Sequence, residues 1–230
     1  MSSQLIADST ELHDATTITP TIVTVDRSYS IKPHLEELKA GFDNTLQGLK
    51  LHPISNATAE VAIITYSDKA EVFQPFRRPM EIESFPELTA GGTTNIAAAV
   101  DLGLTVLEER KQAYRKVGSV NAPLYFFISD GHPTSGGSLD YHRQTISKVR
   151  KLEEQKKLSA VFPIAIGDFD MEFLSEFSSK RRPLRVKDGP GHLIELFKFI
   201  EASIEIASTT APSEEIELDP ETLKTWADLR

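Results

Sequence analysis

The chain has 230 residues, 40% of them hydrophobic, which is enough for one substantial core and favours a single domain with short extensions. Its formal net charge of −9, from 25 Lys and Arg against 34 Asp and Glu, argues against a protein that binds nucleic acid through phosphate contacts. The sequence has no cysteine, so disulfides, thiolate metal sites and cysteine nucleophiles are excluded.

The N-terminal segment is polar and rich in Ser and Thr. It lacks the basic region and the apolar region of a secretory signal peptide. No later stretch reaches the roughly 18 consecutive apolar residues expected of a membrane span. We therefore interpret residues 1–19 as an N-terminal extension and expect a cytoplasmic protein with no membrane attachment.

The first half of the chain predicts a strand, a helix and a hairpin in that order. Residues 21–25 (TIVTV) form a β-branched run that ends on Asp26, which indicates a central strand. Residues 31–51 carry apolar side chains at three- and four-residue intervals, the pattern of an amphipathic helix. Residues 59–66 (AEVAIITY) and 71–73 predict two further strands joined by a polar turn.

The second half of the chain alternates strands and helices. The pattern predicts helices over 95–114, 141–157, 171–178 and 192–207, and strands over 124–129, 158–166 and 184–186. The strand at 124–129 is mostly apolar and is followed by Asp130. Apolar strands that alternate with helices imply a mostly parallel sheet covered on both faces. Residues 209–230 become acidic and less hydrophobic, which is typical of a tail or linker, although Trp226 could still dock locally.

Oxygen-bearing side chains gather where two of the predicted strands end. In open α/β sheets, ligands bind beyond the carboxyl ends of the strands. Three clusters fit this position: Asp26-Arg27-Ser28-Tyr29-Ser30, Gly91-Gly92-Thr93-Thr94 directly before a helix, and Asp130-Gly131-His132-Pro133-Thr134. Carboxylates and hydroxyls are hard oxygen ligands that suit Mg²⁺, with Mn²⁺ or Ca²⁺ as alternatives. Two carboxylates leave the coordination shell of such an ion incomplete, so the site favours a further carboxylate.

The three clusters resemble the characteristic elements of von Willebrand factor A-type domains. VDRSYS resembles the D-x-S-x-S element, GGTT the threonine loop, and ISDGHPTSGG the strand-end aspartate loop, and together they look like a complete metal-ion-dependent adhesion site. The resemblance covers roughly Pro20 to Ala207, so residues 20–208 are interpreted as the domain. It implies a three-layer, doubly wound, Rossmann-like α/β fold with a six-stranded, mostly parallel sheet, one antiparallel edge strand and helices on both faces.

The resemblance also implies a ligand set and a function. Mg²⁺ would be held by Ser28, Ser30 and Thr94 directly, and by Asp26 and Asp130 directly or through water. Thr94 is preferred because family members usually place this threonine five residues before a small-then-aliphatic pair, here Ala99-Val100, and Thr93 stays open as the alternative. The implied function is a non-catalytic interaction module in which the metal binds an Asp or Glu of a partner protein.

A finer resemblance concerns the subgroup within the family. The runs FPELTAGGTTNIAAAV, SDGHPTSGG and IGDFDMEFLSEFS are most similar to bacterial cytoplasmic von Willebrand A proteins associated with tellurium resistance. This resemblance implies a role in a stress-response or signalling assembly. One departure is that many members have Gly and Met where this chain has Tyr29 and Ile31, so Arg27 and Tyr29 either shape the rim of the site or are solvated loop residues.

Simpler interpretations remain for several of these residues. Ser30 and Thr94 could be helix N-caps alone, and Asp170 is a stronger candidate for a cap than for a second acidic patch with Asp168. A single loop histidine such as His132 is more often a bystander than a ligand. The competing function is a Mg²⁺-dependent hydrolase or phosphatase that uses the same strand-end site, but the chain lacks a P-loop, a G-x-S-x-G elbow and a strand-end D-x-D pair followed by a hydroxyl.

Overall fold

The computed structural model describes residues 17–85, 87–114, 120–121, 123–130, 139–158, 160–167, 169–189, 191–210 and 220–228. The strands are β1 (Thr19–Asp26), β2 (Ala59–Tyr66), β3 (Ala70–Arg77), β4 (Leu124–Ser129), β5 (Ala160–Ala165), β6 (Leu184–Val186) and β7 (Ala227–Asp228). The helices are α1 (Leu35–Leu51), α2 (Pro53–Thr58), α3 (Ile96–Tyr114), α4 (Leu139–Glu154), α5 (Met171–Ser175), α6 (His192–Thr209) and α7 (Pro220–Trp226), with short 3-10 helices η1 (Tyr29–His34) and η2 (Pro79–Glu81).

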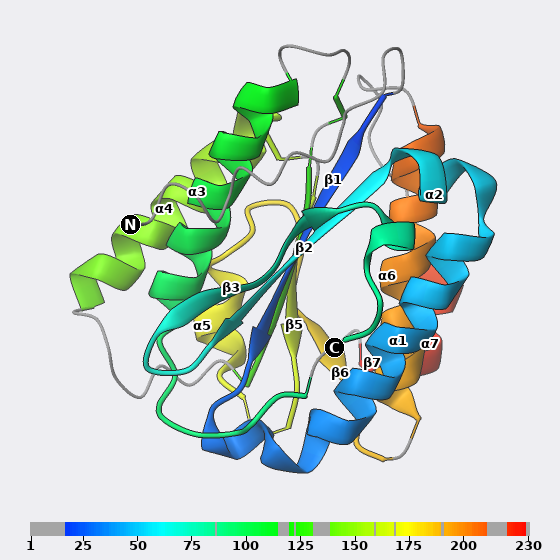
Figure 1. Ribbon diagram of the computed structural model, residues 1–230. Coiled ribbons are helices and arrows are strands. Elements are labelled where there is room, and N and C mark those ends of the chain that lie inside the picture. The colour runs from blue at the N-terminus through cyan, green and yellow to red at the C-terminus, as the bar shows by residue number, and fades with distance from the viewer. Residues whose placement is uncertain are drawn as a thin grey trace.

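A single sheet with the strand order β3-β2-β1-β4-β5-β6-β7 lies between two layers of helices. Figure 1 shows α3, α4 and α5 over one face and α1, α2, α6 and α7 over the other. The strands from β2 to β6 in this order are parallel, and both edge strands are antiparallel to their neighbours. The predicted three-layer α/β fold is confirmed, with seven strands instead of six.

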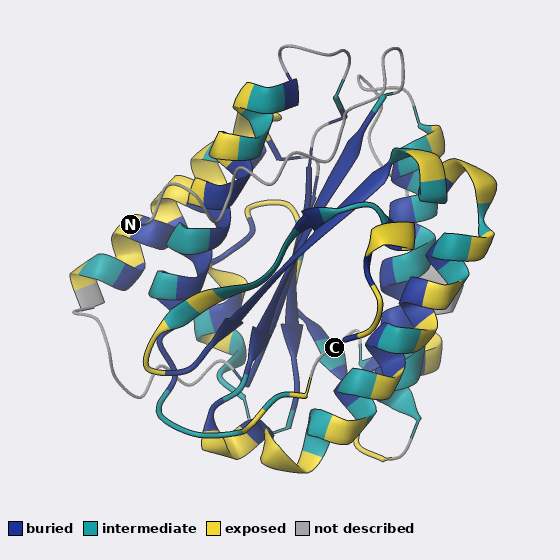
Figure 2. Ribbon diagram, in the orientation of Figure 1, coloured by how far each residue is buried: buried dark blue, intermediate teal, exposed yellow. Residues whose placement is uncertain are grey.

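Burial on both faces explains why the central strands read as continuous apolar runs. Every residue of β1 is buried, and the inner strands of the sheet are dark blue in Figure 2, whereas the edge strand β3 is mostly teal. Side chains alternate between the two layers, so Val23 and Val25 pack with α1 and α6, while Ile22 packs with α3. This regular packing holds the carboxyl ends of the central strands in fixed register.

The two edges of the sheet are protected in different ways. The predicted hairpin is present, and β3 has irregular register against β2 and contains Pro75, which has no N–H to offer another strand. At the opposite edge, β7 pairs with β6 in antiparallel orientation. Within the described ranges, no helix combines the length and the apolar character needed to cross a membrane.

The strand β7 comes from the segment interpreted as an acidic tail or linker. Trp226 is fully buried, its ring centroid lies 5.3 Å from that of Phe199, and its carbonyl accepts a hydrogen bond of 2.9 Å from the N–H of Lys187. The acidic residues of the segment lower its average hydrophobicity, so the sequence pattern does not reveal the short apolar group of Leu223, Trp226 and Ala227 that packs on the core. Residues 220–228 therefore pack as part of the folded domain.

The helix predicted over residues 31–51 starts differently from expectation. Its first residues form the 3-10 helix η1, and the α-helix begins only at Leu35. Pro33 lies inside η1, where its missing N–H removes a donor from the first turns. The short helix η1 begins at Tyr29, within the first oxygen-bearing cluster, so the change in helix type helps to set the path of that loop.

Candidate functional site

The strand order places the topological switch point of the sheet at the carboxyl ends of β1 and β4. The chain leaves β1 toward β2 on one side and later returns to β4 on the other side, so these two neighbouring strands flank the topological switch point of the sheet. Asp26 is the last residue of β1, and Asp130 directly follows β4. Both side chains are buried, with 0% and 4% of the residue surface exposed. The structure therefore brings two carboxyl groups together where α/β proteins bind ligands.

A chain of hydrogen bonds connects these two carboxyl groups. The Ser28 N–H donates to Asp26 Oδ1 at 2.8 Å, and the Ser28 and Ser30 hydroxyls lie 3.0 Å apart. The Ser30 hydroxyl donates to Asp130 Oδ2. Ser129, which the sequence interpretation did not single out, donates from its hydroxyl to Asp26 Oδ2 at 3.2 Å. Four of the five predicted site residues thus form one connected group.

The fifth predicted residue, Thr94, lies on a loop that is fastened to the same end of the sheet. The Gly91 N–H donates to the Arg27 carbonyl, and the Asn95 N–H donates to the Ser67 carbonyl, each at 2.9 Å. Arg27 directly follows β1, and Ser67 directly follows β2. Thr94 is only 2% exposed. Its loop therefore reaches the switch point from the β2 side.

Helix capping explains other polar residues near the site. The Asn95 side chain accepts a hydrogen bond of 3.1 Å from the Ala98 N–H, as an N-cap of α3 does. Asp170 caps α5 by accepting from the Phe173 N–H at 2.9 Å, which agrees with the simpler interpretation of this residue. His132 and Asp168, the other loop candidates, lie outside the described residues.

The electrostatics of the site disfavour a free negative charge. Burial raises the pKa of Asp26 from its usual 3.8 to about 6, and the nearby Asp130 adds to this effect, although hydrogen bonds from Ser28 and Ser129 oppose it. Burial also raises the pKa of Tyr66 far above its ordinary value, so this phenol stays neutral beside Asp26. A buried carboxyl group in these surroundings needs either a proton or a cation to compensate its charge.

The available donor atoms fit a hard divalent cation better than a softer metal. Asp26 and Asp130 supply carboxylate oxygens, and Ser28, Ser30 and Thr94 carry hydroxyls. Among the described residues, no group of three or more His, Cys, Asp or Glu side chains is placed to hold a metal ion. An ion at this position would therefore depend on hydroxyl oxygens in addition to the two carboxylates.

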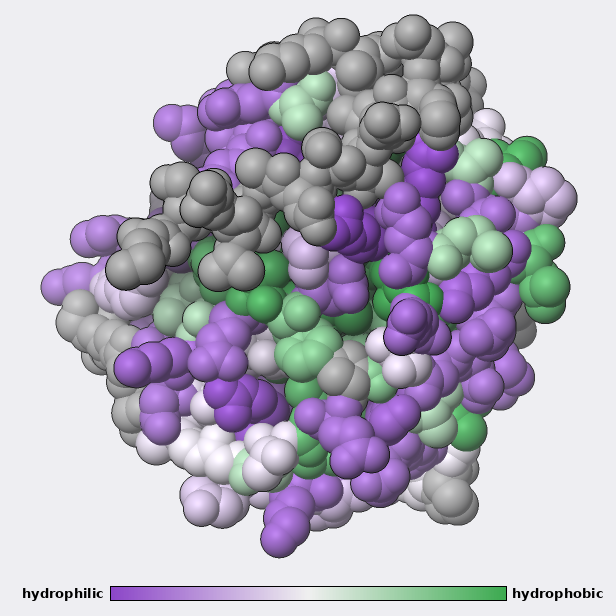
Figure 3. All heavy atoms as spheres, in the orientation of Figure 1, coloured by the Kyte–Doolittle hydropathy of each residue, from purple (hydrophilic) through white to green (hydrophobic). Residues whose placement is uncertain are grey.

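The rim of the site carries one prominent aromatic side chain. Tyr29 is 71% exposed, whereas the guanidinium of Arg27 lies 3.6 Å from the Glu71 carboxylate. The other large apolar side chains that are exposed in the described part of the chain are Leu51, Ile54 and Met80, none of which belongs to the strand-end loops. Hydrophilic residues cover most of the described surface in Figure 3. Tyr29 is therefore an unusual surface residue beside the two carboxyl groups.

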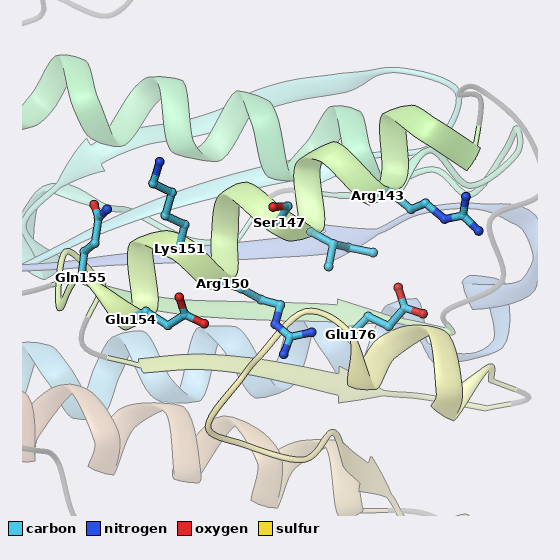
Figure 4. A pocket seen from close by; sticks show the side chains of 8 residues that line it. Arg143, Ser147, Arg150, Lys151, Glu154, Gln155 and Glu176 are labelled. Carbon is cyan, nitrogen blue, oxygen red and sulfur yellow. The ribbon is translucent and has the colours of Figure 1, made fainter.

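A groove of about 630 Å³ lies elsewhere, along α4. Its lining includes the cations Arg143, Arg150 and Lys151, but also the carboxylates Glu154 and Glu176. In Figure 4, the Arg150 side chain extends between those of Glu154 and Glu176. The opposite charges offset one another, and none of the five predicted ligands lines this groove.

Comparison with known proteins gives a consistent result at the level of the domain. Residues 22–197 match the family model described as von Willebrand factor type A domain. Among solved structures, the chain is similar to a von Willebrand factor type A protein from Catenulispora acidiphila, with a TM-score of 0.60 and 14% identity over 83% of this chain and 43% of that chain. It is also similar to proximal thread matrix protein 1 from the mussel byssus, with a TM-score of 0.57 and 16% identity over 84% of this chain and 49% of that chain.

A third similar structure is the conserved hypothetical protein BatB from Bacteroides thetaiotaomicron, with a TM-score of 0.53 and 16% identity over 84% of this chain and 100% of that chain. At these identities, the likeness concerns the fold alone, and the chain spans less than half the length of the first two structures. No match was found among curated protein sequences. Because the family model covers more than half of its residues, the chain belongs to the von Willebrand factor type A domain family.

Proposed function

We propose that this domain is a non-catalytic, metal-dependent interaction module. In this proposal, Asp26, Ser28, Ser30, Thr94 and Asp130 hold Mg²⁺, and the partner is a protein that presents an Asp or Glu side chain. Domains of this family commonly mediate protein–protein interactions. When bound, the ion would supply positive charge and a coordination position for a partner carboxylate.

The observation that carries the proposal is the buried pair Asp26 and Asp130 at the switch point of the sheet, linked through the backbone N–H of Ser28 and the hydroxyls of Ser28 and Ser30. A purely structural hydrogen-bond network would not require two carboxyl groups, since burying the charge of each is costly. A dication would compensate both charges and accept the hydroxyl oxygens at the same time. Burial raises the pKa of Asp26, so the charged form of this carboxyl group is unfavourable unless a bound cation compensates it.

Calorimetric titration with Mg²⁺ tests the proposal directly. The wild-type protein should bind one ion, and Asp26→Ala should not, because it loses a buried carboxylate. Affinity capture from native cells, with and without a chelator, should then recover a protein only when the metal is present. The absence of Mg²⁺, Mn²⁺ and Ca²⁺ binding by the wild-type protein would contradict the proposal.

The biological setting is proposed on the sequence resemblance alone. The runs around residues 85–100, 129–137 and 166–178 support a bacterial, cytoplasmic stress-response or signalling assembly similar to those associated with tellurium resistance.

Phosphatase and ATPase assays with Mg²⁺ test the absence of catalysis. Robust turnover that disappears in Asp26→Ala would favour a hydrolase instead.

Replacing the exposed aromatic residue at the rim should weaken partner binding without affecting the metal. Tyr29→Ala removes a large side chain that is 71% exposed and contributes no carboxylate to the site. Aromatic side chains at the centre of an interface often contribute about 2 kcal/mol or more, so capture should weaken by about 30-fold or more. Mg²⁺ affinity should stay at the wild-type value, and Tyr29→Phe, which keeps the ring, should retain most of the capture. Unchanged partner affinity in Tyr29→Ala would show that the Tyr29 side chain is solvated and does not contribute to partner binding.

Metal affinity and partner affinity should be linked. An ion held by two carboxylates and neutral hydroxyls dissociates readily, whereas a partner carboxylate adds both charge and a ligand. Mg²⁺ should therefore bind more tightly in the presence of the captured partner than in its absence. Titration of Mg²⁺ under both conditions measures this difference. Equal Mg²⁺ affinities would contradict the proposal that a partner carboxylate binds the metal.

A further inference from the structure

The hairpin turn between β2 and β3 holds the threonine loop through an aspartate that lies 25 residues earlier in the chain. Asp68 Oδ1 accepts a hydrogen bond of 2.9 Å from the Thr93 N–H and a second one from the Thr93 hydroxyl. One carboxylate oxygen thus fixes both the backbone and the side chain of Thr93. The hydroxyl of Thr93 is directed to the hairpin and not to the buried carboxyl groups.

The neighbouring glycine allows this close approach. Gly92 has a φ of +79°, in the left-handed region that favours glycine. A β-carbon at Gly92 would also lie 2.6 Å from Asp68 Oδ2, so a larger residue would collide with the carboxylate. Both carboxylate oxygens of Asp68 therefore contact the Gly92-Thr93 segment closely.

The residue after Thr94 is held by the same turn. The Asn95 N–H donates to the carbonyl of Ser67, the residue that precedes Asp68. Thr94 thus lies between two residues that are each hydrogen-bonded to consecutive positions of one hairpin turn. Thr94 is buried, whereas Asp68 is exposed. The exposed aspartate therefore acts on the site through the loop, without belonging to the buried group.

We infer that Asp68 is a positioning residue for the metal site, which fixes Thr93 so that Thr94 supplies the threonine hydroxyl. This inference rests on the proposed function, and it assigns different roles to the two adjacent threonines. Residues that orient metal ligands from outside the coordination shell commonly change metal affinity by about 10–100-fold when they are replaced. Asp68 is exposed, where water competes for its hydrogen bonds, so a change near the lower limit is expected.

Calorimetric titration with Mg²⁺ alone, on the full chain, tests the inference with four variants. Asp68→Ala should weaken Mg²⁺ binding by about 10-fold. Asp68→Asn should restore most of the affinity, because the amide oxygen can still accept from Thr93. Thr93→Val removes one donor and should have an intermediate effect. Glu71→Ala is the matched control, since it removes an exposed acid of the same hairpin that accepts nothing from the threonine loop, and it should bind Mg²⁺ almost as the wild type does.

Spectra of the metal-free proteins supply a second measurement. The NMR amide resonances of Thr93 and Thr94 should move in Asp68→Ala and stay in place in Glu71→Ala, with thermal melting confirming that each variant is folded. Equal weakening of Mg²⁺ binding in Asp68→Ala and Glu71→Ala would show an effect of charge and overturn the inference. Wild-type affinity in Asp68→Ala, together with lost binding in Asp26→Ala, would overturn the role of Asp68 and leave the proposed function intact. The absence of Mg²⁺, Mn²⁺ and Ca²⁺ binding by the wild type would overturn both.

Discussion

Thr94→Ala is expected to abolish Mg²⁺-dependent capture of the partner while the domain stays folded. The substitution removes a hydroxyl from the proposed metal site, which should cost more affinity than the about 10–100-fold typical of residues outside the coordination shell. Thr94 lies on a loop beyond the ends of the strands, and Asn95 provides the side-chain cap of α3. The stability cost should therefore be about 1 kcal/mol, small beside the ~5–15 kcal/mol of a typical domain.

Pull-down and thermal melting of the same Thr94→Ala protein measure the two effects separately. Thr94→Ser is the matched control, because it keeps the hydroxyl and should retain metal-dependent capture. Capture at wild-type strength by Thr94→Ala would contradict the assignment of Thr94 as a ligand and favour Thr93 instead. Gross unfolding of Thr94→Ala would show that the residue has a structural role.

Asp26→Asn is expected to stabilise the metal-free protein near pH 8 by about 3 kcal/mol. A carboxyl pKa raised from 3.8 to about 6 corresponds to roughly this free energy when the group must ionise inside the fold. The introduced amide would keep the geometry of the site, since its oxygen can accept from the Ser28 N–H and its NH₂ can donate to the Ser129 hydroxyl. The variant should gain stability and lose Mg²⁺ binding together.

The pH dependence of this effect has a defined direction. Because the folded pKa of Asp26 lies above 3.8, its stabilising contribution is complete below about pH 4 and is lost as the pH rises through 6. Denaturant unfolding without metal should therefore show the two proteins converging at low pH, separating between about pH 4 and 6, and keeping a nearly constant difference above that. Saturating Mg²⁺ should restore the stability of the wild type at pH 8 and leave Asp26→Asn unchanged. A variant that is less stable than the wild type at pH 8 without metal would contradict the predicted cost of ionising Asp26.

Much of the fold could be predicted because it depends on local patterns. The core residues indicated by the apolar strands are all at most 1% exposed: Val23, Val25, Ile63, Ile64, Phe126, Phe127 and Ile164. Asp26 and Asp130 could be placed at one end of the sheet because parallel strands present their carboxyl ends together. Ser28 and Ser30 could be named because VDRSYS resembles the D-x-S-x-S element of the family. The structure brings these four residues into hydrogen-bonding contact.

The parts that escaped prediction depend on contacts between distant residues. Asp68 looked like an ordinary residue of a polar turn, and its role appears only when Thr93, 25 positions later, is placed against it. Ser129 ends an apolar strand, and nothing in its local sequence indicates that its hydroxyl reaches Asp26. The strand β7 has two residues, too few to show a period, and its pairing depends on the burial of Trp226.

The closing strand at the edge of the sheet also determines how far the domain can be shortened. A recombinant fragment trimmed to the family match, residues 22–197, would contain all five proposed ligands but would end inside α6 and lack β7. The backbone groups of β6 would then face solvent, and the apolar surface that Trp226 covers would be exposed beside them. Exposed strand edges next to apolar surface promote self-association. Such a fragment is therefore expected to aggregate, and a failed capture with it would not test the chemistry of the site.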